Sequence, residues 1–171
     1  MDFEKLGRAH SVLGYVIIID FCALMLSIAS ASIRLLYLIV ISVLIIFVAL
    51  VARFFTFLYF GSCLISARQL FSLHKTRLLL TGITFILYAI TLALSFIWNT
   101  LLVVSIISEI AAFILLGDGL RVIAHDKNLK DLENYGFFIM VGGLLILATI
   151  GLLVVGIYLV LAGSRLKAMS D

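Results

Sequence analysis

The chain contains no proline, only two cysteines and few charged residues, and each scarcity removes a class of protein. The absence of proline excludes a collagen-like chain, and two cysteines in 171 residues are too few for a secreted disulfide scaffold. Charged residues make up 12% of the chain, about half the usual share, whereas hydrophobic residues reach 65%. This balance excludes an ordinary soluble domain and a disordered chain. A small integral membrane protein remains.

The scarce charges divide the chain into long apolar runs. A membrane-crossing helix needs about 20 predominantly apolar residues, and a helix satisfies its own backbone hydrogen bonds in lipid. Strands of a membrane barrel would alternate apolar and polar residues, which these runs do not. The sequence therefore predicts an all-α, multi-pass helical bundle in the cell membrane. The five predicted spans are 11–31, 35–61, 78–98, 101–116 and 137–162.

The number of spans depends on Arg53, because a loop at this residue would divide one long run and give six spans. Cytoplasmic segments carry an excess of Lys and Arg, so the distribution of basic residues decides between the two topologies. Six spans would place most basic residues outside, whereas five spans place eight inside and three outside. We predict five spans with the N-terminus inside. The three basic residues on the outer side are then Arg34, Arg165 and Lys167.

Three charged residues, Asp20, Arg53 and Glu109, lie within the predicted spans. A charge at the middle of a membrane helix costs about 2.5 to 3.5 kcal/mol on insertion scales, so such residues have a partner or a use. Counting from the inner ends of their spans, all three lie at a similar depth of about 12 to 14 Å. One arginine and two carboxylates at one depth predict a buried cluster.

This predicted cluster has two interpretations. In the first, ion pairs lock the order of the helices, with hydrogen bonds from neighbours such as Tyr88 or Ser108. In the second, Asp20 or Glu109 changes its protonation in an ion or proton relay, or contacts a charge on a partner subunit. Two ionised carboxylates and one arginine leave one negative charge in excess. The residues alone do not separate the lock from the relay.

No residue pattern indicates a metal, a cofactor or a catalytic site. The three histidines, His10, His74 and His125, fall in inner segments and show no metal-ligand spacing. Cys22 and Cys63 are expected at different depths and so are predicted to be free thiols. The net charge of +3 is typical of inner loops and not of a nucleic-acid-binding stripe. We therefore predict no cofactor, no metal, no nucleic-acid partner and no enzymatic activity.

Two inner segments and a weak internal repeat organise the chain. Residues 68–77 and 118–135 mix basic and apolar side chains, which predicts amphipathic segments at the inner membrane surface or solvated connections. Residues 45–64 align without gaps with 101–120, matching Gly-x-x-Leu at Gly61 and Gly117. Such a repeat would relate two helical hairpins by an axis along the membrane normal.

Glycines are concentrated in the last predicted span. Glycine faces let helices approach closely in lipid, so we expect this span to be packed on both sides, within the chain or against a neighbouring subunit. At 100° per residue, Gly136, Gly143 and Gly151 fall near one side of the helix and Gly142, Gly156 and Gly163 near the other.

The arrangement resembles small, uncharacterised multi-spanning membrane proteins that are common in archaea. In these, a span enters a Gly-x-x-Leu amphipathic stretch and is followed by an apolar helix that opens on glycine. The matching residues here are Gly61 and Leu64, then Gly117, Leu120 and Gly136. The resemblance covers about the last two-thirds of the chain and implies no activity.

The sequence favours a non-catalytic membrane subunit or assembly factor, held by helix packing and by the Asp20, Arg53 and Glu109 cluster. Its partners would be the lipid bilayer and other membrane subunits or a second copy of the chain. The alternative is a small transporter or channel for an ion or small molecule that uses the same three charges. A transporter would gain stability with its substrate, whereas an isolated subunit would lose stability.

Overall fold

The computed structural model describes residues 3–33, 36–69, 71, 74–98, 100–146 and 149–169. These residues form six α-helices and, within the described ranges, no strand. No proline interrupts the apolar runs, and a helix is the form that satisfies every backbone group in lipid. The helices are α1 (Phe3–Ile33), α2 (Leu36–Ala67), α3 (Lys75–Ser95), α4 (Thr100–Asp126), α5 (Lys130–Leu144) and α6 (Ile150–Lys167).

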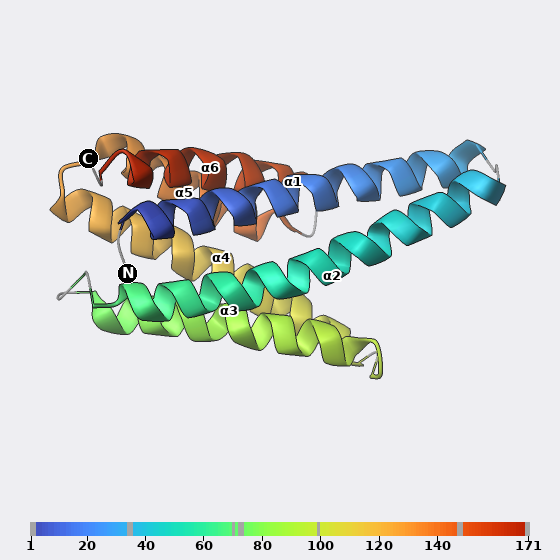
Figure 1. Ribbon diagram of the computed structural model, residues 1–171, viewed down its shortest axis with the longest axis horizontal. Coiled ribbons are helices and arrows are strands. Elements are labelled where there is room, and N and C mark those ends of the chain that lie inside the picture. Colours follow the sequence, from blue (N-terminus) through green and yellow to red (C-terminus); the bar gives the residue numbers. More distant parts are fainter. Residues whose placement is uncertain are drawn as a thin grey trace.

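Each helix packs against the next one along the chain, and α6 closes the ring by packing against α1 (Figure 1). Among the described residues, five helices are long and apolar enough to span a membrane, and α5 is the one that is not. The predicted all-α, membrane-spanning bundle is therefore confirmed. Large aromatic side chains fill its centre, and those fully buried include Phe57, Phe60, Phe85, Tyr88 and Phe113.

The span predicted over 137–162 is not one helix. Helix α5 ends at Leu144, α6 begins at Ile150, and the chain reverses direction between them (Figure 1). Thr149 has a positive φ of 61°, which residues of a right-handed helix do not adopt, so helical continuity ends there. A Cβ atom at Gly151 would collide with the backbone of the turn, so the close reversal needs glycine there. Apart from Thr149, the residues between the two helices are apolar, which is why hydropathy did not reveal the turn.

This reversal places both ends of the chain at the same end of the bundle (Figure 1). Arg165 and Lys167, predicted on the outer side, lie beside the start of α1 instead. In the described chain, ten Lys and Arg residues lie at this end, which we call the basic end. The opposite end is called the far end. Arg34, predicted there, lies outside the described residues.

The inner segment predicted over 118–135 is divided between two helices. Helix α4 continues to Asp126, the chain turns at Asn128 with a φ of 54°, and α5 starts at Lys130. This turn therefore divides the predicted amphipathic segment into two parts on different helices. Asp126 pairs with His74 at 2.5 Å, from its Oδ2 to the imidazole Nε2, and so joins α4 to the start of α3.

Pairs of glycines mark close helix approaches. A Cβ atom on Gly61 would lie 2.7 Å from the carbonyl oxygen of Gly82, closer than any real Cβ contact. Each glycine therefore receives the backbone of its partner helix, an arrangement common between membrane helices. Four such pairs occur: Gly7 with Gly163 and Gly14 with Gly156 between α1 and α6, Gly61 with Gly82 between α2 and α3, and Gly117 with Gly136 between α4 and α5.

The segments of the predicted repeat, 45–64 and 101–120, lie in α2 and α4. In both, the Gly-x-x-Leu glycine contacts a glycine of the following helix. Helix α6 carries the same pattern, and its glycine contacts α1, so the chain ends supply a third contact of this kind. The leucines of all three patterns, Leu64, Leu120 and Leu166, are buried in the core.

Helices α1 and α2 extend towards the far end beyond the other helices (Figure 1). Their lengths of about 46 and 48 Å exceed the hydrocarbon thickness of about 30 Å. We call residues 22–33 and 36–52 the arm, and its part nearest the bundle, at Phe47 and Leu50, lies beside Leu92 at the end of α3. Ser30 and Ser42 hydrogen bond across the arm, with their Oγ atoms 2.8 Å apart. Most described side chains of the arm are exposed on the protein surface.

Candidate functional site

The structure brings Asp20, Arg53 and Glu109 together in the middle of the bundle. They come from α1, α2 and α4, and each is at most 9% exposed. The Nε atom of Arg53 lies 3.4 Å from Oδ2 of Asp20, and its Nη2 atom forms an ion pair with Oε1 of Glu109. Arg53 lies within α2, so the six-span alternative with a loop at this residue is wrong.

Aromatic rings support the Arg53 guanidinium from the side of the basic end. Its central carbon lies 5.5 Å from the ring centre of Phe57 and 5.4 Å from that of Tyr88. Such contacts stabilise a desolvated cation. Phe57 also packs with Phe85 and Phe113, at centroid distances of 5.3 and 5.9 Å, and the three rings form a buried aromatic layer.

The reversal between α5 and α6 lies at the depth of this cluster. The glycine pairs Gly7–Gly163 and Gly14–Gly156 fix the antiparallel register of α1 and α6. In this register Asp20 is level with Ile150, the first residue of α6. A helix N-terminus carries a partial positive charge, which favours a carboxylate nearby. Discontinuous membrane helices that end at mid-depth line the binding sites of many transporters.

A cavity of about 130 Å³ adjoins the cluster on the side of the far end. Asp20 and Arg53 line it together with apolar residues of α1, α2 and α6, among them Ala23, Leu50 and Leu152. Glu109 does not line the cavity, so the two carboxylates differ in access. At the basic end, the cavity inside the core measures only about 10 Å³, room for one water at most.

The cluster combines a fixed cation with two anions. Arginine stays protonated in proteins, so Arg53 contributes a permanent positive charge. With both carboxylates ionised, the buried cluster carries one negative charge in excess, and a buried unpaired charge is costly. One further cation, such as a proton, makes the cluster neutral. Because Asp20 lines the cavity, it is the carboxylate that such a cation can reach.

Of the six glycines predicted to pack the last span, Gly136, Gly143, Gly151 and Gly156 make three kinds of contact. Gly136 contacts Gly117 and Gly143 contacts Phe113, and both of these partners lie on α4. Gly156 faces α1, whereas Gly151 faces the turn between α5 and α6. The sides predicted for an unbroken helix do not apply, because the chain reverses between Gly143 and Gly151.

Sequence reasoning found the three charges but missed the mid-depth end of α6 and the cavity. The signal that was available for α6 is its Gly-x-x-Leu pattern at Gly163, which repeats those at Gly61 and Gly117. The histidines make separate contacts. His10 is buried, with Nδ1 2.8 Å from the carbonyl oxygen of Leu6, whereas His74 pairs with Asp126. In the described ranges, no three His, Cys, Asp or Glu side chains are placed to share a metal ion.

The chain matches no protein-family model, and comparisons with curated proteins and with solved structures give no significant match. The interpretation of the cluster therefore depends on its geometry.

Proposed function

We propose that the protein is a small transporter of the cell membrane in which a proton and a small cation compete for one site at Asp20. The observation that carries this proposal is the buried cluster of one arginine and two carboxylates, beside a cavity that Asp20 lines and Glu109 does not. A packing lock explains the ion pairs, but it does not account for the cavity. It also does not account for α6 beginning at the depth of the cluster.

Each residue has a distinct role in this proposal. Glu109, which lies away from the cavity, holds Arg53 in place. Asp20 binds Arg53 from the cavity side at 3.4 Å and exchanges that contact for a proton or a cation. The buried aromatic layer of Phe57, Phe85 and Phe113 closes the path towards the basic end. In this proposal the cavity is the access path from one side of the membrane, as alternating access requires.

The distribution of basic residues supports a cytoplasmic basic end. Cytoplasmic segments are enriched in Lys and Arg, and ten such residues of the described chain lie at the basic end. With both termini in the cytoplasm, the excess of basic residues on the cytoplasmic side is larger than in the topology predicted from sequence. The cavity beside Asp20 then faces the external half of the membrane.

The test is proton movement in vesicles that contain the purified protein and a pH-sensitive dye. A proton gradient is imposed in the presence of sodium, potassium or guanidinium in turn. We expect wild-type vesicles to dissipate the gradient faster than protein-free vesicles, at a rate that one of these cations changes. Asp20→Asn abolishes the difference, because asparagine does not ionise.

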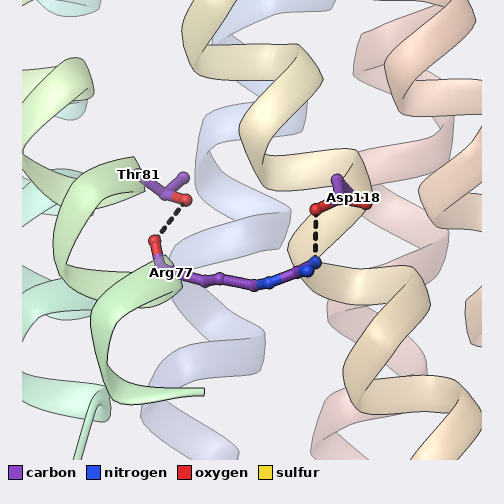
Figure 2. A network of polar contacts seen from close by, with 3 residues as sticks. All are labelled: Arg77, Thr81 and Asp118. Carbon is purple, nitrogen blue, oxygen red and sulfur yellow. Dashed lines mark hydrogen bonds and ion pairs between the residues drawn. The ribbon is translucent and has the colours of Figure 1, made fainter.

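Asp118→Asn is the matched control, since it also removes a carboxylate but lies half-exposed at the basic end, where Asp118 pairs with Arg77 (Figure 2). This variant keeps the wild-type rate. Wild-type vesicles that behave like protein-free ones with every cation would refute transport. An unchanged rate in Asp20→Asn would refute the assignment of the site.

The arm supports a second candidate function, that of an accessory subunit of a larger membrane complex. Outside the contact between α1 and α2, its described side chains are mostly exposed, including Tyr37, Leu44 and Phe47, each more than half exposed. Isolation from native membranes in mild detergent tests this function. A stoichiometric set of partners supports a subunit, and a lone monomer or homo-oligomer contradicts it.

A further inference from the structure

A groove at the basic end combines cationic, polar and apolar side chains. It has a volume of about 360 Å³ and lies where α2 ends and α3 begins. We call it the basic groove, and its lining residues are Arg68, Gln69, Lys75, Thr76 and Leu79. Among the described residues, no acidic side chain lines it. Polar and cationic groups lie at its mouth, and Leu79 leads from it along the apolar length of α3.

Basic residues that lie near the groove but do not line it form ion pairs with acidic side chains. Arg77, two residues after Lys75, reaches from α3 to α4 and pairs with Asp118 at 2.5 Å (Figure 2). Its carbonyl oxygen accepts a hydrogen bond from the hydroxyl of Thr81 (Figure 2). Arg8 pairs with Glu4 on α1. By contrast, the described residues contain no ion-pair partner for Arg68 or Lys75.

The start of α3 adds to the positive potential of the groove. The helix has no acidic residue in its first turn, and its N-cap, His74, makes no capping hydrogen bond with its side chain. The partial positive charge of a helix N-terminus normally favours an anion. Here Lys75 occupies the first turn and adds charge of the same sign. The carboxylate of Asp126, which pairs with His74, offsets part of this charge, and an anion in the groove would offset the charge of Lys75.

We infer that the basic groove binds the phosphate headgroup of an anionic phospholipid. Arg68 and Lys75 pair with the phosphate, Gln69 and Thr76 supply hydrogen bonds, and an acyl chain follows Leu79 and the exposed Leu80 along α3. A lipid fits better than a free phosphate, because the groove continues onto the apolar surface of a membrane-spanning helix. Basic pockets between helices at the cytoplasmic side are sites of this kind.

Native mass spectrometry of the detergent-purified protein tests the inference with phosphatidylglycerol, phosphatidylcholine and inorganic phosphate as separate probes. We expect phosphatidylglycerol to bind in preference to phosphatidylcholine, and inorganic phosphate neither to bind nor to compete. The variant Arg68→Ala/Lys75→Ala removes the two basic side chains that pair with the phosphate. Its affinity for phosphatidylglycerol therefore falls about 30-fold.

Lys127→Ala/Lys130→Ala is the matched control, because it removes the same charge from the same end of the bundle without altering the groove. It keeps the wild-type affinity. Equal losses in both double variants would show diffuse attraction and overturn the site. Wild-type affinity in the groove variant, or competition by inorganic phosphate, would overturn it as well. Folding of each variant is checked by its helical circular dichroism before binding is measured.

Discussion

At the scale of single residues, Arg53 determines whether the charged cluster can be buried. Its guanidinium contacts two carboxylates and two aromatic rings, and its side chain is about 10% exposed. Removing one member of a buried ion cluster leaves the others without compensation. We expect Arg53→Ala to lower the free energy of unfolding by about 3 to 5 kcal/mol, measured by titration with denaturing detergent.

The control for this prediction is Arg8→Ala, which removes an arginine from an exposed pair with Glu4 and costs about 1 kcal/mol or less. A triple variant in which Asp20→Asn and Glu109→Gln accompany Arg53→Met should regain most of the lost stability, because no charge then remains buried. If Arg53→Ala alone unfolds at the wild-type midpoint, the cluster is not buried as described.

Thr149 presents a second test at this scale, because it holds a β-branched side chain at a φ of 61°. Glycine adopts this conformation without steric cost. Thr149→Gly is therefore expected to raise the free energy of unfolding by about 1 kcal/mol. The same change at Thr84, which lies inside α3 and is partly buried, should lower it by about 0.5 to 1 kcal/mol. A loss of stability at both sites would contradict the turn between α5 and α6.

At the scale of helices, neighbouring elements approach most closely where glycine faces glycine. A Cβ atom on Gly117 would lie 2.8 Å from the backbone nitrogen of Met140 on α5, whereas one on Gly119 would meet nothing within 4 Å. Gly117→Ala should therefore cost about 1 to 3 kcal/mol, since helix α5 must shift. Gly119→Ala, two residues away, should stabilise α4 by about 0.5 to 1 kcal/mol. Equal effects at the two positions would contradict the packing of α4 on α5.

The helices also show what the sequence could predict and why. Long apolar runs located α1 to α4, and counting residues from their ends placed Asp20, Arg53 and Glu109 at one depth. The break before Ile150 was missed, because a reversal made almost entirely of apolar residues leaves hydropathy unchanged. Whether Asp20 or Glu109 faces a cavity depends on how three helices rotate against one another, and no spacing within one helix contains that information.

At the scale of the whole molecule, the hairpin of α5 and α6 determines on which side the chain ends. An unbroken last span would place the termini on opposite sides of the membrane, whereas the observed reversal places them on the same side (Figure 1). The prediction is that epitope tags added to the two ends are cleaved together by a protease applied to one face of sealed vesicles.

The outcome of that experiment also bears on the charge asymmetry. If both tags are cleaved in inside-out vesicles and protected in right-side-out ones, the basic end is cytoplasmic. Arg165 and Lys167 then join the other basic residues in following the positive-inside rule. Cleavage of only one tag in each orientation would restore a continuous span over 137–162. The proposed transport site would then lose the helix terminus that lies level with Asp20.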